Sequence, residues 1–400
     1  MRVLISSSVF YPDHSGIALY ASDFAFFCAE QGHEVDVVTS FPFYPQWQKR
    51  DEDKRKLFRK DEYNNINIYR GYIFVPEKIT TLTRILSEIS FIFSAFINFF
   101  KVKKPDIIVI FTTPVLLGFI SIIFKQIYKS TLIINVQDFQ IEAAESLSLI
   151  KDSIFLKILK KIELLSYKNA DYVTSISPSM VDLLKTKGVQ QPILWPNWID
   201  TNSSIKFTSK GNFKEKYQLV GKHIIAYAGN VGEKQGLEFL IDISCHFQDY
   251  TNIIFLIIGE GAALERLKQY HIKKNNKNLF FLPFLNPEEY KHFLFDVDLF
   301  FLSQKKTSED VYFPSKLLGI MTSCKPILLT ADIDSELFKV FYEQKLGYVT
   351  PYGATEPTLD AIKTYLENKE ATNLHISNAF EYVRFFDRAT ILNKILKLVK

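Results

Sequence analysis

The chain has 400 residues, a length beyond the point at which a single hydrophobic core keeps growing, so two domains are expected. Its 48 basic and 44 acidic residues leave a net charge of +4, which is too balanced to indicate a nucleic-acid partner. The three cysteines, Cys28, Cys245 and Cys324, lie far apart in the sequence, so neither a disulfide framework nor a metal site is predicted.

Apolar runs of strand length alternate with helical stretches through the first half of the chain. Strands are predicted at residues 3–6, 35–39, 107–111, 132–136 and 172–176, and helices at 16–31, 82–100 and 115–128. Because these strands are apolar throughout, the alternation predicts a parallel sheet covered by helices on both faces. The run 49–62 is rich in both signs of charge and is interpreted as a solvated loop or exposed helix without a chemical role.

Two stretches of this half are both apolar and basic. Residues 89–100 are followed by Lys101, Lys103 and Lys104, and residues 154–165 mix leucine and isoleucine with lysine. Each is shorter than the about 20 apolar residues that a spanning helix needs, but a helix of this character lies readily in a membrane interface. Packing against the sheet is the alternative for each stretch. Since the sequence opens with a strand and not a secretory leader, we expect a cytoplasmic protein attached peripherally to the inner face of the membrane.

The periodic pattern is lost at residues 201–221, which are polar. This predicts a linker between a first domain at 1–200 and a second at 222–378, followed by a C-terminal helix at 379–400 that packs back on the first domain. The alternation restarts with predicted strands at 224–227, 253–258, 279–282, 299–302, 326–329 and 347–350. The sequence therefore predicts two Rossmann-like, doubly wound α/β domains that face a cleft.

The stretch 227–238, with the sequence YAGNVGEKQGLE, follows a predicted strand and precedes a predicted helix. Its glycines let the backbone pass close to a ligand, and the amide groups of a helix beginning near Gln235, together with Lys234, suit a diphosphate. A turn that needs glycine only for its backbone geometry is the alternative.

Ligands of open α/β sheets bind beyond the carboxyl ends of the strands, so the loops there are the candidate sites. The first such loop, residues 6–16, contains no Gly-x-Gly-x-x-Gly, which disfavours NAD or FAD. In the second half, Ser315 and Lys316 open a predicted helix, where amide groups and a lysine again suit a phosphate. Glu309 and Asp310 are candidates to accept hydrogen bonds from ribose or sugar hydroxyls. Together these features favour a nucleotide-sugar site.

Short motifs follow one another along nearly the whole chain. They are Tyr11-Pro12 with Gly16, QGHEV at 31–35, PFYP at 42–45, VQD at 136–138, SIS at 175–177, PNW at 196–198, GNVGEKQGLE at 229–238, GEG at 259–261 and PSK at 314–316. On these motifs the sequence resembles family 4 of the retaining glycosyltransferases, which have the GT-B architecture. Within that family it is most similar to bacterial colanic-acid, O-antigen and capsule enzymes of the fucosyltransferase or N-acetylfucosaminyltransferase kind.

The resemblance implies that the second domain binds a nucleotide sugar and that the first binds the acceptor. Transfer is then expected with retention of anomeric configuration and without an essential metal or cofactor. The expected donor is a UDP-sugar in preference to a GDP-sugar, and the expected acceptor is a polyprenyl-diphosphate-linked glycan. The candidate catalytic residues are Asp138, His14 and Glu309. The candidate donor-binding residues are Gly16, Gly229, Asn230, Lys234, Gln235, Gly259, Glu260, Pro283, Phe284, Ser303, Asp310, Pro314, Ser315 and Lys316.

Two of the catalytic candidates also have plainer interpretations. Asp138 follows a strand of the first domain, where the family usually keeps a group that contacts the acceptor or the transferred sugar, but an aspartate there is also a helix N-cap. His14 lies in the first loop, within reach of an acceptor or diphosphate, and is equally read as a solvent-exposed histidine.

The chain departs from the usual family pattern at three positions. Gly319 stands where many members have the second of two paired glutamates, and whether Glu309 or Asp310 replaces that carboxylate is open. Asn230 and Gln235 replace the usual arginine and lysine of the diphosphate turn. The alternatives to a transferase are a nucleotide-sugar epimerase of the same fold and a non-catalytic scaffold that binds a nucleotide sugar.

Overall fold

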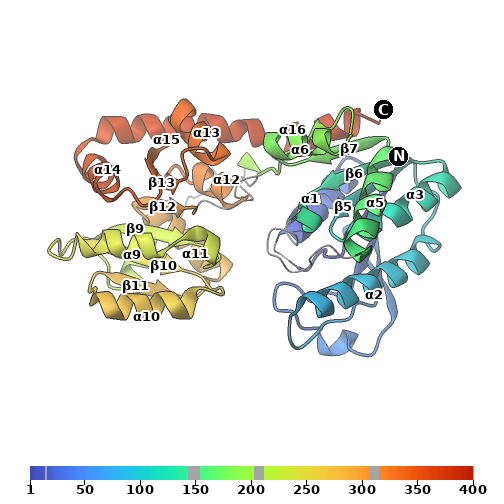
Figure 1. Ribbon diagram of the computed structural model, residues 1–400, viewed down its shortest axis with the longest axis horizontal. Helices are drawn as coiled ribbons and strands as arrows, with labels where there is room; N and C mark the ends of the chain where they lie inside the picture. The colour runs from blue at the N-terminus through green and yellow to red at the C-terminus, as the bar shows by residue number, and fades with distance from the viewer. Residues whose placement is uncertain (14–15, 143–153, 202–210, 306–314, 400) are drawn as a thin grey trace. The chain divides into compact units, whose positions relative to one another are not determined.

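The computed structural model describes residues 1–13, 16–142, 154–201, 211–305 and 315–399 (Figure 1). It divides into two compact units: unit 1 contains Met1–Asn197 and Ile391–Lys400, and unit 2 contains Trp198–Thr390. Strands and helices alternate along the chain in both units (Figure 1).

Unit 1 is built on an eight-stranded sheet, counted over its described residues, with the order β3-β4-β2-β1-β5-β6-β7-β8. Its strands are β1 (Arg2–Ser6), β2 (Glu34–Ser40), β3 (Phe58–Tyr63), β4 (Ile66–Gly71), β5 (Ile107–Thr112), β6 (Thr131–Val136), β7 (Tyr172–Ser175) and β8 (Ile193–Leu194). The pairings are parallel except for β3, which runs antiparallel to β4 at the edge. Every residue of β5 is buried, as the uniformly apolar sequence IIVIFT requires of a strand covered on both faces.

The helices of unit 1 connect these parallel strands. They are α1 (Ile17–Glu30), α2 (Thr81–Phe99), α3 (Val115–Tyr128), α5 (Ile154–Asn169) and α6 (Pro178–Thr186), and the 3-10 turn η1 covers Asp51–Asp53. Two of the helix starts have side-chain caps: the Thr80 hydroxyl accepts the Thr83 N–H at the start of α2, and the Ser177 hydroxyl accepts the Met180 N–H at the start of α6.

Unit 2 has a six-stranded parallel sheet, again within the described residues, with the order β11-β10-β9-β12-β13-β14. The strands are β9 (His223–Ala228), β10 (Ile253–Ile258), β11 (Leu279–Leu282), β12 (Leu299–Ser303), β13 (Ile327–Ala331) and β14 (Tyr348–Pro351). The strand order reverses at β9, between β10 and β12, and ligands of doubly wound sheets bind at such a reversal.

Helices cover both faces of this second sheet. They are α8 (Phe213–Lys216), α9 (Glu238–Cys245), α10 (Leu264–Lys274), α11 (Pro287–Asp296), α12 (Ser315–Thr322), α13 (Glu336–Gln344), α14 (Thr355–Glu367) and α15 (Lys369–Val383), with the turns η2 (Glu233–Gln235) and η3 (Arg384–Phe386); α16 (Arg388–Lys397) follows them. Ile224 and Ala226 of β9 pack in one buried cluster, and Ile225 and Tyr227 pack in the other. This alternation shows that both faces of the strand are buried.

The boundaries differ from the predicted ones in two places. Phe213, inside the predicted linker at 201–221, is fully buried in the core of unit 2, and the Asp296 carboxylate accepts the Lys214 N–H at 2.9 Å. Residues 379–400 are not one helix, because α15 ends at Val383 and α16 begins at Arg388. Residues 391–400 belong to unit 1, where the Tyr172 hydroxyl donates to the Leu398 carbonyl at 2.8 Å.

The interpretation of residues 49–62 as a solvated loop or exposed helix was right about the exposure of most of the run but wrong about its structure. This run contains the edge strand β3 as well as η1, and Asp53 within it is fully buried. Asp53, Arg59 and Asp61 of this run are paired with one another and with Arg70 of the neighbouring strand, and a polarity pattern alone does not reveal these ion pairs.

Candidate functional site

The predicted donor-binding residues that the structure describes in unit 2 lie at the carboxyl ends of four strands. Gly229 and Asn230 follow β9, Gly259 and Glu260 follow β10, Pro283 and Phe284 follow β11, Ser303 ends β12, and Lys234 and Gln235 lie in η2 after β9. Asn230, Lys234, Glu260 and Phe284 are exposed there. Sequence reasoning therefore selected loops that share one edge of one sheet.

The backbones after β9 and β10 stay in contact beyond the end of the sheet. The Val231 N–H donates to the Glu260 carbonyl at 2.8 Å, and the Ala263 N–H donates to the Val231 carbonyl at 3.0 Å. A Cβ on Gly259, whose φ is +141°, would lie 1.8 Å from the Gly229 carbonyl oxygen. Glycine is needed at 259 so that the two loops can approach this closely.

The turn after β9 is closed by its own side chains. The Gly232 N–H donates to the Gln235 Oε1 at 3.0 Å, so this side chain holds the turn together. The predicted helix start at Gln235 was wrong by three residues, because 233–235 form a 3-10 turn and α9 begins at Glu238. Gly236 separates the two with φ +58°, and a Cβ there would meet the Tyr352 hydroxyl at 2.5 Å.

Beside this turn is an ion cluster that the sequence did not single out. Glu238 pairs with Arg266 at 2.5 Å and with the Lys305 ammonium at 3.4 Å. Burial raises the pKa of the Glu238 carboxyl, but its backbone N–H, Arg266 and Lys305 together hold that pKa below its ordinary value. The Lys305 N–H also donates to the Lys234 carbonyl at 2.9 Å, which links the end of β12 to the turn. Lys305 thus adds a second lysine next to Lys234. In the sequence, only its position in the run Gln304-Lys305-Lys306 indicated a basic group here.

Two buried hydroxyls lie at the same edge on neighbouring strands. Ser303 ends β12 and is paired in register with Thr330 of β13. Both Oγ atoms are inaccessible to solvent and have no hydrogen-bond partner among the described residues. Buried polar groups are normally satisfied, so these two are candidates to bond to a ligand or an ordered water.

Part of the predicted site lies outside the described residues. Glu309, Asp310 and Pro314 are not described, so their roles stay predictions. Ser315 and Lys316 are the first two residues of α12. Gly319 follows one turn later, and among the described residues a Cβ there would meet only Ile199, at 4.0 Å. A Cβ at 319 therefore fits without a clash with the described residues.

The candidates in unit 1 lie at the carboxyl edge of its own sheet. Gly16 precedes α1 with φ +58°, and His14 is outside the described residues. Asp138 follows β6, is exposed, and lines a small pocket with residues of β5, α3 and α5. Behind it the buried Glu163 accepts the Tyr167 hydroxyl at 3.1 Å and pairs with Lys187 at 2.5 Å. Asp138 therefore borders a small pocket of mixed polar and apolar lining in which the Glu163 carboxylate is already paired.

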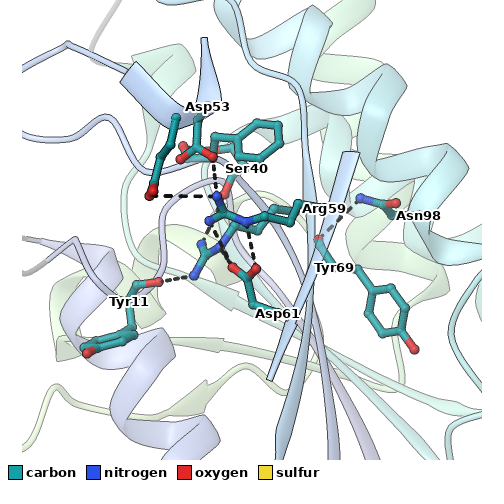
Figure 2. Close-up of polar contacts among 10 residues, drawn as sticks. Tyr11, Ser40, Asp53, Arg59, Asp61, Tyr69 and Asn98 are labelled. Carbon is teal, nitrogen blue, oxygen red and sulfur yellow. Dashed lines mark hydrogen bonds and ion pairs between the residues drawn. The ribbon is translucent and has the colours of Figure 1, made fainter. Parts of the chain in front are cut away.

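The loop after β1 is anchored by charged groups that the sequence reasoning passed over (Figure 2). Arg70 donates to the Tyr11 carbonyl at 2.7 Å and pairs with Asp61 at 2.6 Å, and Figure 2 shows Arg59 beside the same Asp61. The Asp13 carboxylate accepts the Tyr44 N–H at 3.4 Å, which ties this loop to the one after β2. Burial raises the pKa of Asp13 to about 6, although the nearby N–H groups and Arg70 lower it.

Within the part of the chain that the structure describes, no three His, Cys, Asp or Glu side chains gather as metal ligands do. Metal independence stays a prediction, to be tested directly.

Comparison with known proteins identifies the two halves separately. Residues 14–203 match the family model "Glycosyltransferase Family 4", and residues 209–382 match "Glycosyl transferases group 1". Together the two models cover most of the chain, which is therefore a glycosyltransferase of the GT-B type. The predicted family, the α/β class and the GT-B fold are confirmed.

Individual relatives support this glycosyltransferase assignment. The chain is 28% identical over 347 residues to WcaI of Escherichia coli K12, a putative colanic acid biosynthesis glycosyl transferase. The aligned region covers 84% of this chain and 85% of WcaI. Among solved structures, Anabaena HepE in complex with UDP aligns with a TM-score of 0.70 and 13% identity over 100% of this chain and 99% of that one. WaaG, a glycosyltransferase of lipopolysaccharide biosynthesis, aligns with a TM-score of 0.68 and 14% identity over the same shares. WcaI and WaaG are named for colanic acid and lipopolysaccharide biosynthesis, and the family models identify this chain as a glycosyltransferase.

Proposed function

We propose that this glycosyltransferase moves a hexose, a deoxyhexose or an N-acetylamino sugar from a UDP-sugar, in preference to a GDP-sugar, to a polyprenyl-diphosphate-linked glycan. Transfer occurs with retention of configuration and without an essential metal, at the inner face of the cell membrane. The relative WcaI carries the name of colanic acid biosynthesis, and HepE was solved with UDP. These names motivate the acceptor class and the base.

The observation that carries the proposal is the carboxyl edge of the unit 2 sheet. Exposed Asn230 and Lys234 lie in a turn whose backbone is fixed by Gln235 and by the contact between Gly229 and Gly259. Lys305 is joined to that turn through the Lys234 carbonyl. A preorganised set of amides and ammonium groups stabilises the charge that develops on a leaving diphosphate, which is the role a divalent ion plays elsewhere.

The base is tested by a thermal-shift screen of the whole protein with UDP, GDP, ADP and dTDP. A ligand that binds only the folded state raises its stability, by about 2.7 kcal/mol at a hundredfold excess over Kd, so UDP should give the largest shift. Lys234→Ala should raise the apparent Kd for UDP, obtained from the thermal shift, at least tenfold. Lys273→Ala, which removes an exposed lysine from α10, should leave it unchanged. Equal shifts for all nucleotides, or an unaltered Lys234→Ala, would exclude this diphosphate site.

The reaction is tested with UDP-sugars and a polyprenyl-diphosphate glycan, with and without EDTA. Transfer that survives EDTA and gives a product with the donor's anomeric configuration by NMR is the expected result. Turnover of UDP-N-acetylglucosamine without any acceptor would instead identify an epimerase. UDP binding without transfer or donor hydrolysis would identify a non-catalytic scaffold.

A further inference from the structure

The helix α2 of unit 1 has an apolar face that none of the described residues of the unit covers. Leu82, Leu86, Ile89 and Phe93 follow the spacing of one helix face, and all are exposed, Phe93 at 70%. Phe100, directly after the helix, extends the line and is 60% exposed. The opposite face holds Phe91, Ala95 and Phe99, all fully buried. A surface helix normally turns its polar side outward, so an outward face that is apolar as well is unusual.

The apolar face continues over two neighbouring helices. Phe100 and Phe96 both contact Phe124 of α3, with ring centroids 4.9 and 5.6 Å apart. On α3 the exposed apolar residues are Phe119, Ile123 and Ile127, and on α5 they are Ile158, Leu164 and Leu165. Gly118 of α3 lies against Ser166 of α5, where a Cβ on the glycine would be 3.1 Å from the serine Cβ. The α2–α3–α5 face is defined by these exposed residues on α2, α3 and α5, with Phe100.

The charges of these three helices are strongly one-sided. Their basic residues are Arg84, Lys125, Lys157, Lys160, Lys161 and Lys168, and Lys101, Lys103 and Lys104 follow α2. Their acidic residues are Glu88 and Glu163. Glu163 is buried against Lys187, and Glu88 is half-buried and accepts a hydrogen bond from Gln140 at 3.0 Å. Lys125 is paired with Asp171 at 2.8 Å, so the outward positive charge comes from the exposed Lys157, Lys161 and Lys168 and from the lysines after α2. This charge complements an anionic lipid surface.

The helix α2 is anchored in the fold. By length and composition alone, Leu82–Phe99 is apolar enough to cross a membrane. However, the Ser94 hydroxyl donates to the Tyr72 carbonyl at 2.8 Å and the Asn98 amide donates to the Tyr69 carbonyl at 3.3 Å, so the helix is bonded to the end of β4. Spanning would break these bonds and expose Phe91 and Phe99. Lying in the plane of the interface retains them.

We propose that the α2–α3–α5 face lies on the surface of an anionic lipid bilayer, with its leucine, isoleucine and phenylalanine side chains in the interface and its lysines among the headgroups. The inference deepens the proposed function, which needs access to a lipid-linked acceptor, but the face is defined by exposure and charge alone. Binding to vesicles can therefore succeed or fail independently of transfer.

The test is co-sedimentation of the full chain with vesicles that contain phosphatidylglycerol and with vesicles of phosphatidylcholine alone. We expect binding to the anionic vesicles that weakens at high salt, because exposed charges are screened. Leu86→Ser with Phe93→Ser should weaken binding at least tenfold. The matched control is Leu374→Ser with Phe385→Ser, which removes equally exposed apolar residues from unit 2 (53% and 74%) and should bind as the parent does.

A charge-reversal pair provides a second measurement. Lys157→Glu with Lys161→Glu should abolish the preference for anionic vesicles, whereas Lys273→Glu with Lys277→Glu on unit 2 should retain it. Circular dichroism and the UDP thermal shift of each variant establish that it is folded. Absence of vesicle binding by the parent chain, or unchanged binding by Leu86→Ser with Phe93→Ser, would overturn the inference. A different result would also overturn it: a parent chain that is a dimer by light scattering, that does not bind vesicles, and that becomes a monomer in Leu86→Ser with Phe93→Ser. A second copy of the chain would then cover the face.

Discussion

The glycine at 259 illustrates how a single residue fixes the candidate donor site. Its φ is +141°, and a Cβ at this position would lie 1.8 Å from a backbone oxygen, so there is neither the conformational nor the spatial freedom for a side chain. The obstructing atom is the Gly229 carbonyl oxygen, which is backbone and cannot rotate away. Substitution must therefore separate the β9 and β10 loops.

We expect Gly259→Ala to destabilise unit 2 by about 2–4 kcal/mol and to weaken UDP binding, because strain and loop displacement add. Gly353→Ala is the matched control: its φ is +82°, but nothing lies within 4 Å of its Cβ, so only a cost of about 1 kcal/mol is expected. Urea unfolding and the UDP thermal shift measure both. Equal costs for the two variants would contradict the role given to the close approach.

Asp13 gives unit 1 a specific pH dependence. Its pKa in the folded chain is about 6 because it is buried, against an ordinary value of 3.8. Between these values the folded state keeps a proton that the unfolded state has lost, so stability is higher at acidic pH and falls as pH rises from about 4 to 6. The shift of about two pH units corresponds to about 3 kcal/mol.

We expect Asp13→Asn to remove this fall of stability with pH. The stability of the variant minus that of the parent should therefore be larger at pH 7 than at pH 4. The amide oxygen still accepts the Phe43 and Tyr44 N–H groups, so the loop contact is retained. Urea midpoints measured across this pH window check the prediction, with Glu62→Gln, an exposed carboxylate of β3, as the control. Parallel curves for the parent and Asp13→Asn would contradict it.

At the scale of an element, the turn η2 shows how a departure from a family motif acquires a structural role. Gln235 stands in place of the usual lysine, and its Oε1 accepts the Gly232 N–H. Gln235→Ala should therefore cost about 1 kcal/mol, since the turn loses one hydrogen bond. Gln235→Glu retains an acceptor and should restore most of that stability, while its negative charge weakens UDP binding. Differential unfolding and UDP titration separate the two effects, and an unchanged stability of Gln235→Ala would show that the bond is unimportant.

The strand β3 shows what a charge pattern conceals. Arg59 and Asp61 are two residues apart and therefore share a face of the strand, where they meet Arg70 of β4 and the buried Asp53. A sequence window records only that such a run is polar. Pairing across strands, which the window does not contain, places part of it in a partly buried ion network.

At the scale of the whole molecule, the chain returns to unit 1 at its C-terminus. Ile391, Leu392, Ile395 and Leu396 are buried, and all lie in the segment 391–400 that belongs to unit 1. We expect Leu392→Ala to destabilise this unit by about 2–5 kcal/mol, the cost of a core truncation. Lys394→Ala on the exposed side of α16 should be neutral.

Hydrogen exchange distinguishes the units in this experiment. Amides of β7 in unit 1 should lose protection in Leu392→Ala, and those of β10 in unit 2 should keep it. Loss of protection in β10 alone would show that α16 stabilises unit 2 instead.

Much of the architecture was predictable because it depends on local periodicity. The ends of α3, β10 and β11 agree with the predicted boundaries. The two strands are continuous apolar runs, and α3 is a largely apolar stretch that follows Pro114. The linker was placed less well: Phe213 is one apolar residue in a polar stretch, and its burial depends on Phe293 and Tyr217, which pack against it. Gln235 was assigned to a helix start because a 3-10 turn and an α-helix begin with the same glycine-rich signal.

The sequence by itself determined the family, the alternation of strands and helices, and which loops gather at the carboxyl edge of the second sheet, because these depend on residue order and on spacing along one chain. Only the tertiary structure decided that Lys305 and Glu238 join the turn at Lys234, that Arg70 anchors the first loop, and that α2 turns its apolar side outward. Each of these depends on which distant residues become neighbours and on which face is left uncovered, and burial is a property of the folded chain as a whole.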